Sequence, residues 1–106
     1  MMPADGFQIN HGETVRSERT LSDGQKNISV SCRECHSRLY TQHTQRNFAA
    51  TINLRAGTLD NTSKIRPVAQ MWTSSAQLWA IQQDILSYSG QPSDYTPWID
   101  AWKASP

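Results

Sequence analysis

Short runs of alternating apolar and polar residues fill the first half of the chain. They cover residues 7–9 (FQI), 13–20 (ETVRSERT) and 26–31 (KNISVS), and turn-forming residues separate them at Gly12 and at residues 22–25 (SDGQ). Such short alternating or β-branched runs are typical of strands in a sheet with one buried face. An Asp-Gly pair between two such runs favours a hairpin. We therefore expect an antiparallel meander in this half of the chain.

Three further segments continue the extended pattern. Residues 38–42 (RLYTQ) predict another strand, and residues 47–57 (NFAATINLRAG) give the strongest strand pattern in the chain. Residues 65–72 (IRPVAQMW) predict an extended segment, because Pro67 disfavours the helical region for Arg66. Together these patterns indicate a mainly β chain.

The last third of the chain changes to a helical pattern. In residues 74–86 (SSAQLWAIQQDIL), Leu78 and Ile81 lie at helical spacing, which predicts a short helix. Trp79 in this segment and Trp72 before it are expected to be packing residues, because buried aromatic rings contribute large apolar areas. A ligand groove is the alternative for some of the tryptophans.

Residues 96–105 (TPWIDAWKAS) predict a C-terminal helix. Thr96 is a favourable N-cap, and Pro97 follows at the first helical position, where its missing N–H has no partner to lose. Trp98 and Trp102 lie four residues apart and therefore share one face of a helix. We expect this helix to dock through its tryptophans.

Composition limits the class of protein. At 106 residues, with 37% apolar residues and a negative mean hydropathy, residues 1–106 are expected to form a single globular domain. No apolar run approaches the roughly 20 residues that span a bilayer. Ten basic residues against nine acidic ones leave a net charge of +1, which argues against nucleic acid or a membrane as partner. The first ten residues show no secretory signal pattern, so we expect a reducing, cytoplasmic location.

The two cysteines of the chain, Cys32 and Cys35, form a Cys-x-x-Cys motif between two strand-like runs. This spacing allows both thiolates to point at one metal ion, and zinc is the ion that such pairs bind most often. A pair of thiols without metal is the alternative. A thioredoxin-like redox pair is disfavoured, because that chemistry places the first cysteine at a helix N-terminus.

A closed structural zinc site needs four ligands, so two further donors are required. The candidates are His11, His36 and His43, although each is more simply explained as a surface or turn histidine. His36 is too close to Cys35 in the chain to be an easy third ligand. His43 is far enough along the chain to fold back toward the cysteines.

Five segments, in this order, resemble the C-terminal part of the glutathione-dependent formaldehyde-activating (GFA) enzyme family, whose domain is shared with centromere protein V. The segments are PADGFQINHGE, SCRECHSRLY, LRAGTLD, IRPVAQMWTSSAQLW and YTPWIDAW. The resemblance implies a mainly β fold of small stacked antiparallel sheets around a zinc knuckle, followed by short C-terminal helical segments. It also implies that the N-terminal part of the domain is missing from residues 1–106. A truncated gene and a short paralogue both explain this.

The resemblance further implies two metal sites. One is structural and combines an early Cys-x-Cys pair with a later Cys-x-x-Cys pair; the other is catalytic and uses a Cys-His-Cys-x-x-Cys motif. In this chain only the later pair matches, as Cys32 and Cys35, so these are the expected metal ligands and no catalytic residue is assigned. Two positions depart from the family pattern, because His36 replaces a Gly and Gln70 replaces a His.

The family activity that the resemblance implies is of the carbon–sulfur lyase type, which forms or cleaves the adduct of formaldehyde with glutathione. We expect this chain to lack that activity; the alternative function is a non-catalytic zinc-binding structural or interaction module. Glutathione or another thiol adduct is the expected partner of the intact domain, and Lys64 and Arg66 are candidates for binding its carboxylates. Thr58 and Asp60 are expected to form a turn. A homodimer could pool two cysteine pairs around one zinc ion.

Overall fold

A computed structural model describes residues 1–44 and 50–106 of the chain. The chain divides into two compact units, Met1–Ser63 and Lys64–Pro106. The elements of the first unit are β1 (Met2–Pro3), the 3-10 helix η1 (Ala4–Gly6), β2 (Thr14–Thr20), β3 (Lys26–Cys32), β4 (Arg38–His43), β5 (Thr51–Leu54) and the 3-10 helix η2 (Ala56–Thr58). Those of the second are β6 (Ala69–Gln70), the 3-10 helices η3 (Thr73–Ser75) and η4 (Leu78–Ala80), β7 (Leu86–Ser87) and the helix α1 (Thr96–Ala104).

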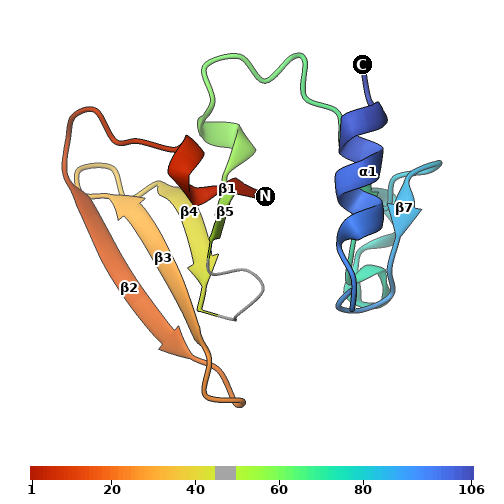
Figure 1. The fold of residues 1–106 in the computed structure, drawn as a ribbon, viewed down its shortest axis with the longest axis horizontal. Coiled ribbons are helices and arrows are strands. Elements are labelled where there is room, and N and C mark those ends of the chain that lie inside the picture. Colours follow the sequence, from red (N-terminus) through yellow and green to blue (C-terminus); the bar gives the residue numbers. More distant parts are fainter. Residues whose placement is uncertain (45–49) are drawn as a thin grey trace. The chain divides into compact units, whose positions relative to one another are not determined.

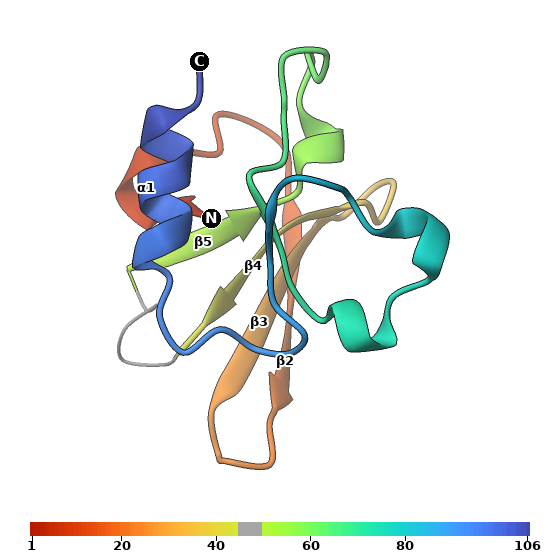
Figure 2. The ribbon, with the colours of Figure 1, turned by 90° about the vertical axis from the view of Figure 1, so that its right-hand side faces the viewer.

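The first unit is built on a five-stranded antiparallel sheet with the order β1-β5-β4-β3-β2 (Figure 1). From β2 to β5 each strand pairs with the next one along the chain, which is the predicted meander, and β3 and β4 lie side by side in the middle of the sheet (Figure 2). The short β1 adds to the free edge of β5 through Met2 and Ile52. Pro3 is tolerated there, since an edge strand leaves one row of backbone groups unpaired.

The predicted hairpin between β2 and β3 is confirmed. Its loop is closed by a bond from the Leu21 N–H to the Gln25 carbonyl at 2.7 Å, and the Gly24 N–H donates to the Leu21 carbonyl at 3.0 Å. Gly24 has φ +84°, a conformation that glycine adopts without steric cost. The Asp23 carboxylate accepts a further bond from the Gln25 N–H at 3.0 Å. The Asp-Gly sequence therefore determines where the chain reverses.

The core of the first unit is small and lies on one face of the central strands. Ile28 and Val30 of β3 and Ile52 of β5 are buried, and Tyr40 lies directly opposite Val30 on β4. The ring of Phe7 packs edge-on against Tyr40, with 5.2 Å between the ring centroids. The loop before β2 thus covers part of the apolar face of the sheet.

Two strand predictions in this unit need correction. Residues 7–9 form no strand: the Phe7 N–H bonds back to the Ala4 carbonyl and the ring serves the core, so the segment needs no strand partner. The strand expected over residues 47–57 is shorter, because β5 ends at Leu54 and the chain then turns into η2. Residues 47–49 of that prediction lie outside the described residues.

In the second unit, polar side chains bond to backbone groups of segments that are distant in the sequence. Strands β6 and β7 form a short parallel pair, in which Ala69 pairs with Leu86 and Gln70 with Ser87. The Gln70 amide donates to the Gln82 carbonyl at 2.8 Å and to the Ser87 hydroxyl at 2.7 Å, and it accepts a bond from the Gln82 N–H at 3.0 Å. Gln70 therefore acts as a structural residue that fixes β7 and the segment before it.

The helix predicted over residues 74–86 is wrong. The segment forms the separate turns η3 and η4 and then enters β7. The hydroxyls of Thr73 and Ser74 bond to the carbonyls of Tyr88 and Ser89, and Gln70 binds the backbone of Gln82. Side-chain bonds of this kind compete with the helical hydrogen-bond pattern, and here they prevail.

The predicted C-terminal helix is confirmed as α1, but its cap differs. The N-cap is Tyr95 rather than Thr96, and the Asp94 carboxylate accepts a bond from the Thr96 N–H at 2.9 Å. The backbone N–H and the hydroxyl of Thr96 lower the pKa of Asp94. A carboxylate at this end of a helix is favourable, since it satisfies an unpaired N–H and faces the positive end of the dipole.

The prediction that the four tryptophan side chains pack against the rest of the protein is confirmed for Trp98. Trp98 packs against the rings of Tyr95 and Tyr88, at centroid distances of 4.9 and 5.7 Å. Trp72, Trp79 and Trp102 are all at least half exposed, so the prediction that they pack is wrong for these three. No helix in the described part of the chain has the length and apolar character needed to cross a membrane.

The buried position of Val30 predicts an unequal effect of two identical substitutions in neighbouring strands. Val30 is 5% exposed, whereas Val15 on β2 is 46% exposed. We expect Val30→Ala to lower the free energy of unfolding by about 2 kcal/mol, from lost burial and the cavity that remains. Val15→Ala is the matched control and should cost well under half as much. Denaturant unfolding of both variants measures this, and equal costs would contradict the described core.

Candidate metal-binding turn and the adjoining depression

The two cysteines lie at the ends of one tight turn between β3 and β4. Cys32 is the last residue of β3, and its carbonyl accepts a bond from the His36 N–H at 2.9 Å. The Cys32 N–H donates to the Ser37 carbonyl at 2.9 Å, which closes the turn. The Cys32 side chain also contributes to lowering the pKa of Cys35. The turn therefore presents two sulfurs to one ligand, and its strand flanks differ from the helix N-terminus of a thioredoxin-like pair.

His36 enables this turn in an unusual way. It has φ +62°, in the left-handed region that favours glycine, which is the residue that the resembled family has at this position. This conformation has a modest steric cost for a residue with a Cβ atom. The His36 side chain is exposed, so the position serves the path of the backbone.

Ser37 contacts the cysteine pair, and the sequence patterns did not identify it. The Cys35 thiol donates to the Ser37 hydroxyl at 3.3 Å, and Cys35 is exposed. When the thiol is ionised, the hydroxyl and the backbone N–H of Ser37 can both donate to the sulfur. These bonds, followed by one from Cys32, lower the pKa of Cys35 below its ordinary value. A thiolate stabilised in this way is a better metal ligand.

An open depression of about 720 Å³ adjoins the turn. Its lining comes from residues 9 and 11–13 of the loop before β2, residue 14 at the start of β2, residue 32 at the end of β3, residues 33–34 of the turn, and residue 39 of β4. The register between β3 and β4 shifts after Val30, and this bulge brings Leu39 beside Cys32 in the lining. Gly12, with φ +85°, lets the loop turn into β2.

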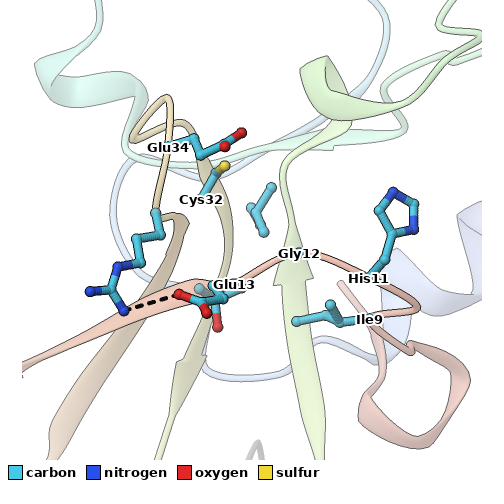
Figure 3. A pocket seen from close by; sticks show the side chains of 9 residues that line it. Ile9, His11, Gly12, Glu13, Cys32 and Glu34 are labelled. Atoms are coloured by element: carbon cyan, nitrogen blue, oxygen red, sulfur yellow. Dashed lines mark hydrogen bonds and ion pairs between the residues drawn. The ribbon is translucent and has the colours of Figure 1, made fainter.

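An ion pair ties the turn to the loop. The Arg33 guanidinium donates to the Glu13 carboxylate at 3.0 Å, and the Arg33 N–H donates to the Glu13 carbonyl at 3.1 Å (Figure 3). Both side chains are largely exposed, so the charge interaction itself contributes little stability. The backbone bond continues the ladder of β2 and β3 by one residue. It therefore fixes the position of the turn relative to the loop.

The three histidines do not complete a metal site. His11 lines the depression on the side opposite Cys32 and Glu34 (Figure 3). His43 pairs with Asn27 at the far end of β4, roughly 17 Å along the strand from its start. Across residues 1–44 and 50–106, no three His, Cys, Asp or Glu side chains are grouped so as to hold a metal ion. Completion of the site by His43 is therefore wrong for this structure.

The residues expected to form a turn or to bind glutathione carboxylates are either part of a turn or exposed to solvent. Thr58 forms a turn as predicted, because its hydroxyl donates to the Arg55 carbonyl at 2.6 Å within η2. Asp60, which was expected to bond backbone amides in this turn, is exposed and makes no hydrogen bond among those described. Lys64 and Arg66 begin the second unit and are exposed, and the Arg66 guanidinium donates to the carbonyl of its neighbour Ile65.

Comparison with known proteins gives one match. A family model with the description glutathione-dependent formaldehyde-activating enzyme (GFA) matches residues 1–75. No curated protein and no solved structure matches the chain. The matched span includes the whole five-stranded sheet and the turn with both cysteines.

The contacts of Ser37 predict how the reactivity of Cys35 depends on pH. In a Cys32→Ser background, Ser37→Ala removes the hydroxyl donor but keeps the backbone N–H, so the Cys35 pKa should rise toward its ordinary value. Less thiolate is then present at neutral pH, and alkylation by iodoacetamide should slow several-fold there but not at high pH. Ser22→Ala, in the β2–β3 loop, is the control and should leave the profile unchanged. A profile that does not move in Ser37→Ala would show that Ser37 does not stabilise the thiolate.

Proposed function

Because the chain belongs to the glutathione-dependent formaldehyde-activating enzyme family, we propose that it is a zinc-binding domain in which Cys32 and Cys35 supply half of a structural metal site. The observation that carries the proposal is the turn itself. It carries two sulfurs on one tight turn, and Ser37 places a hydroxyl and an N–H where they stabilise the second thiolate. This is the arrangement that a metal ligand pair needs, since the thiolate is the binding form.

The two cysteines supply two of the four ligands that a structural zinc ion takes. A structural zinc takes four ligands in a tetrahedron, with each sulfur at about 2.3 Å, and two cysteines on one turn occupy two of the corners. The described residues bring no third donor to the turn. The other two ligands must come from a further polypeptide segment, and the simplest source is the same turn of a second copy. When bound, the ion would crosslink the segments that hold it.

We assign no lyase step to this chain. The catalytic motif that the family resemblance implies has three thiolates, and the 106 residues contain two cysteines, both in the structural pair. Glutathione, or another thiol adduct, is therefore a proposed partner of a site that this chain does not form alone. Since zinc requires both thiols reduced, the proposal places the protein in a reducing compartment such as the cytoplasm.

The second candidate is the lyase activity itself, of the S-(hydroxymethyl)glutathione synthase type. The family match favours it, and so does the depression beside Cys32, which has room for a small thiol adduct. However, two of the charged groups that line the depression, Glu13 and Arg33, bind each other. These two residues therefore offer no free charged pair for acid–base chemistry.

The half-site predicts the zinc stoichiometry. A single turn supplies two ligands, so tight binding should occur at one zinc ion per two chains and should be lost in both Cys32→Ser and Cys35→Ser. His43→Ala is the matched control, because His43 lies at the far end of β4, and it should bind as much zinc as the parent chain. Metal analysis together with the mass in solution measures this. Tight zinc at one ion per chain that survives Cys35→Ser would refute the half-site.

The missing thiolates also predict an absence of catalysis. Zinc-loaded protein should not change the rate at which S-(hydroxymethyl)glutathione forms or decays, measured by NMR with formaldehyde and glutathione. The control is the same mixture with the Cys32→Ser, Cys35→Ser double variant. Turnover by the parent chain above both the uncatalysed rate and the double variant would establish the lyase activity instead.

A further inference from the structure

Strand β2 is an open edge of the sheet. All seven of its residues, Thr14–Thr20, are exposed, and β3 is its partner on one side only (Figure 1). An edge strand presents a row of unpaired backbone groups that can pair with another strand. Proteins protect such edges in several ways, among them charged side chains, bulges and covering loops. The charges on β2 have both signs, since Glu18 lies between Arg16 and Arg19.

The register of β2 with β3 shows which backbone groups point outward. The Arg33 N–H donates to the Glu13 carbonyl, and at the other end the Leu21 N–H donates to the Gln25 carbonyl. In an antiparallel pair, residues alternate between those bonded to the partner strand and those facing away. The odd-numbered residues of β2 therefore bond to β3. The outward N–H and C=O groups belong to Thr14, Arg16, Glu18 and Thr20.

We propose that β2 pairs with β2 of a second copy, antiparallel and centred on Ser17, to form a sheet that is continuous across a two-fold axis. In this register Thr14 lies opposite the partner's Thr20, and Arg16 lies opposite the partner's Glu18. All four outward-facing residues on each strand are then used, and each of the four resulting pairs exchanges two backbone hydrogen bonds. The interface is isologous, which is the commonest kind in homodimers.

The charged side chains of β2 also favour the register that is centred on Ser17. Arg16 and the partner's Glu18 face each other twice across the axis, and opposite charges in directly opposed positions stabilise a strand pair. Within one chain, the Glu18 carboxylate already accepts a bond from Arg16 at 3.0 Å and lies 3.3 Å from the Lys26 ammonium. Glu18 thus carries its negative charge at the place where the partner brings a guanidinium.

The neighbouring registers are less favourable both in the charges they oppose and in the number of backbone groups they pair. Centring the pair on Arg16 places two guanidinium groups opposite each other, and centring it on Glu18 does the same with two carboxylates. Like charges directly opposite are destabilising. Each of these registers also pairs fewer of the outward-facing residues of β2. The hydrogen-bond pattern and the charges therefore agree on Ser17 as the centre.

This dimer is distinct from one that shares zinc. Cys32 lies opposite Thr14 at one end of the β2–β3 pair. Antiparallel pairing places the partner's Thr14 at the other end, so the two cysteine turns are at least about 20 Å apart. One zinc ion cannot join them in this arrangement. The β2 dimer should therefore form in the presence of a chelator, which separates it experimentally from the proposed metal site.

Charge exchange at positions 16 and 18 tests the proposal. In the homodimer of Arg16→Glu, the substituted carboxylate faces the partner's Glu18, and in that of Glu18→Arg two guanidinium groups face each other. By analytical ultracentrifugation with EDTA, each variant alone should dimerise at least about tenfold more weakly than the parent chain. An equimolar mixture of the two variants should dimerise as well as the parent, because its heterodimer places a carboxylate opposite a guanidinium at both positions.

Arg19→Glu is the matched control. It makes the same change on the same strand, but in this register residue 19 lies opposite the partner's Val15, so dimerisation should stay within about twofold of the parent. Circular dichroism of each variant checks that the sheet is intact. A parent chain that stays monomeric at millimolar concentration in EDTA would overturn the proposal. So would two single variants that dimerise like the parent, or a mixture of folded variants that fails to recover dimerisation.

Discussion

The hydrogen-bond ladder between β3 and β4 is the feature on which the rest of the first unit depends. In its middle the ladder sets the buried Val30 opposite Tyr40, and the ring of Tyr40 packs against Phe7 beside the core. At its end the bond from the Cys32 N–H to the Ser37 carbonyl closes the turn that carries both cysteines. The same strand pair therefore carries the buried apolar face and the turn with the candidate metal ligands. Loss of the ladder would remove both together.

The parts of the fold that follow from local patterns could be predicted from the sequence. The β2–β3 hairpin depends on the Asp23–Gly24 pair and on alternating side chains, and both are visible in the chain. The departure at His36, where the resembled family has a Gly, was visible in the sequence, and the residue adopts the left-handed region that favours glycine. Strand β5 was found but its length was not, since its end at Leu54 depends on the turn of η2.

The errors arise where side chains bond to distant backbone. Gln70 holds the chain at Gln82, and Ser74 bonds to the Ser89 carbonyl, so residues 74–86 lose the helix that their apolar spacing predicts. Such contacts join residues more than ten positions apart, and no local pattern reports them. The role of Ser37 was missed for a different reason. A serine two residues after a cysteine is common, and its donation to the sulfur becomes evident only with the geometry of the turn.

The central claim is that Cys32 and Cys35 are two ligands of a shared zinc site, in a member of a family that the sequence and the family match both indicate. X-ray absorption at the zinc edge tests it most directly, because the first shell reports the kind and number of ligand atoms. We expect four sulfur ligands at about 2.3 Å, two from each of two turns. A shell dominated by nitrogen or oxygen, or one that is unchanged when Cys35 is replaced by serine, would contradict it.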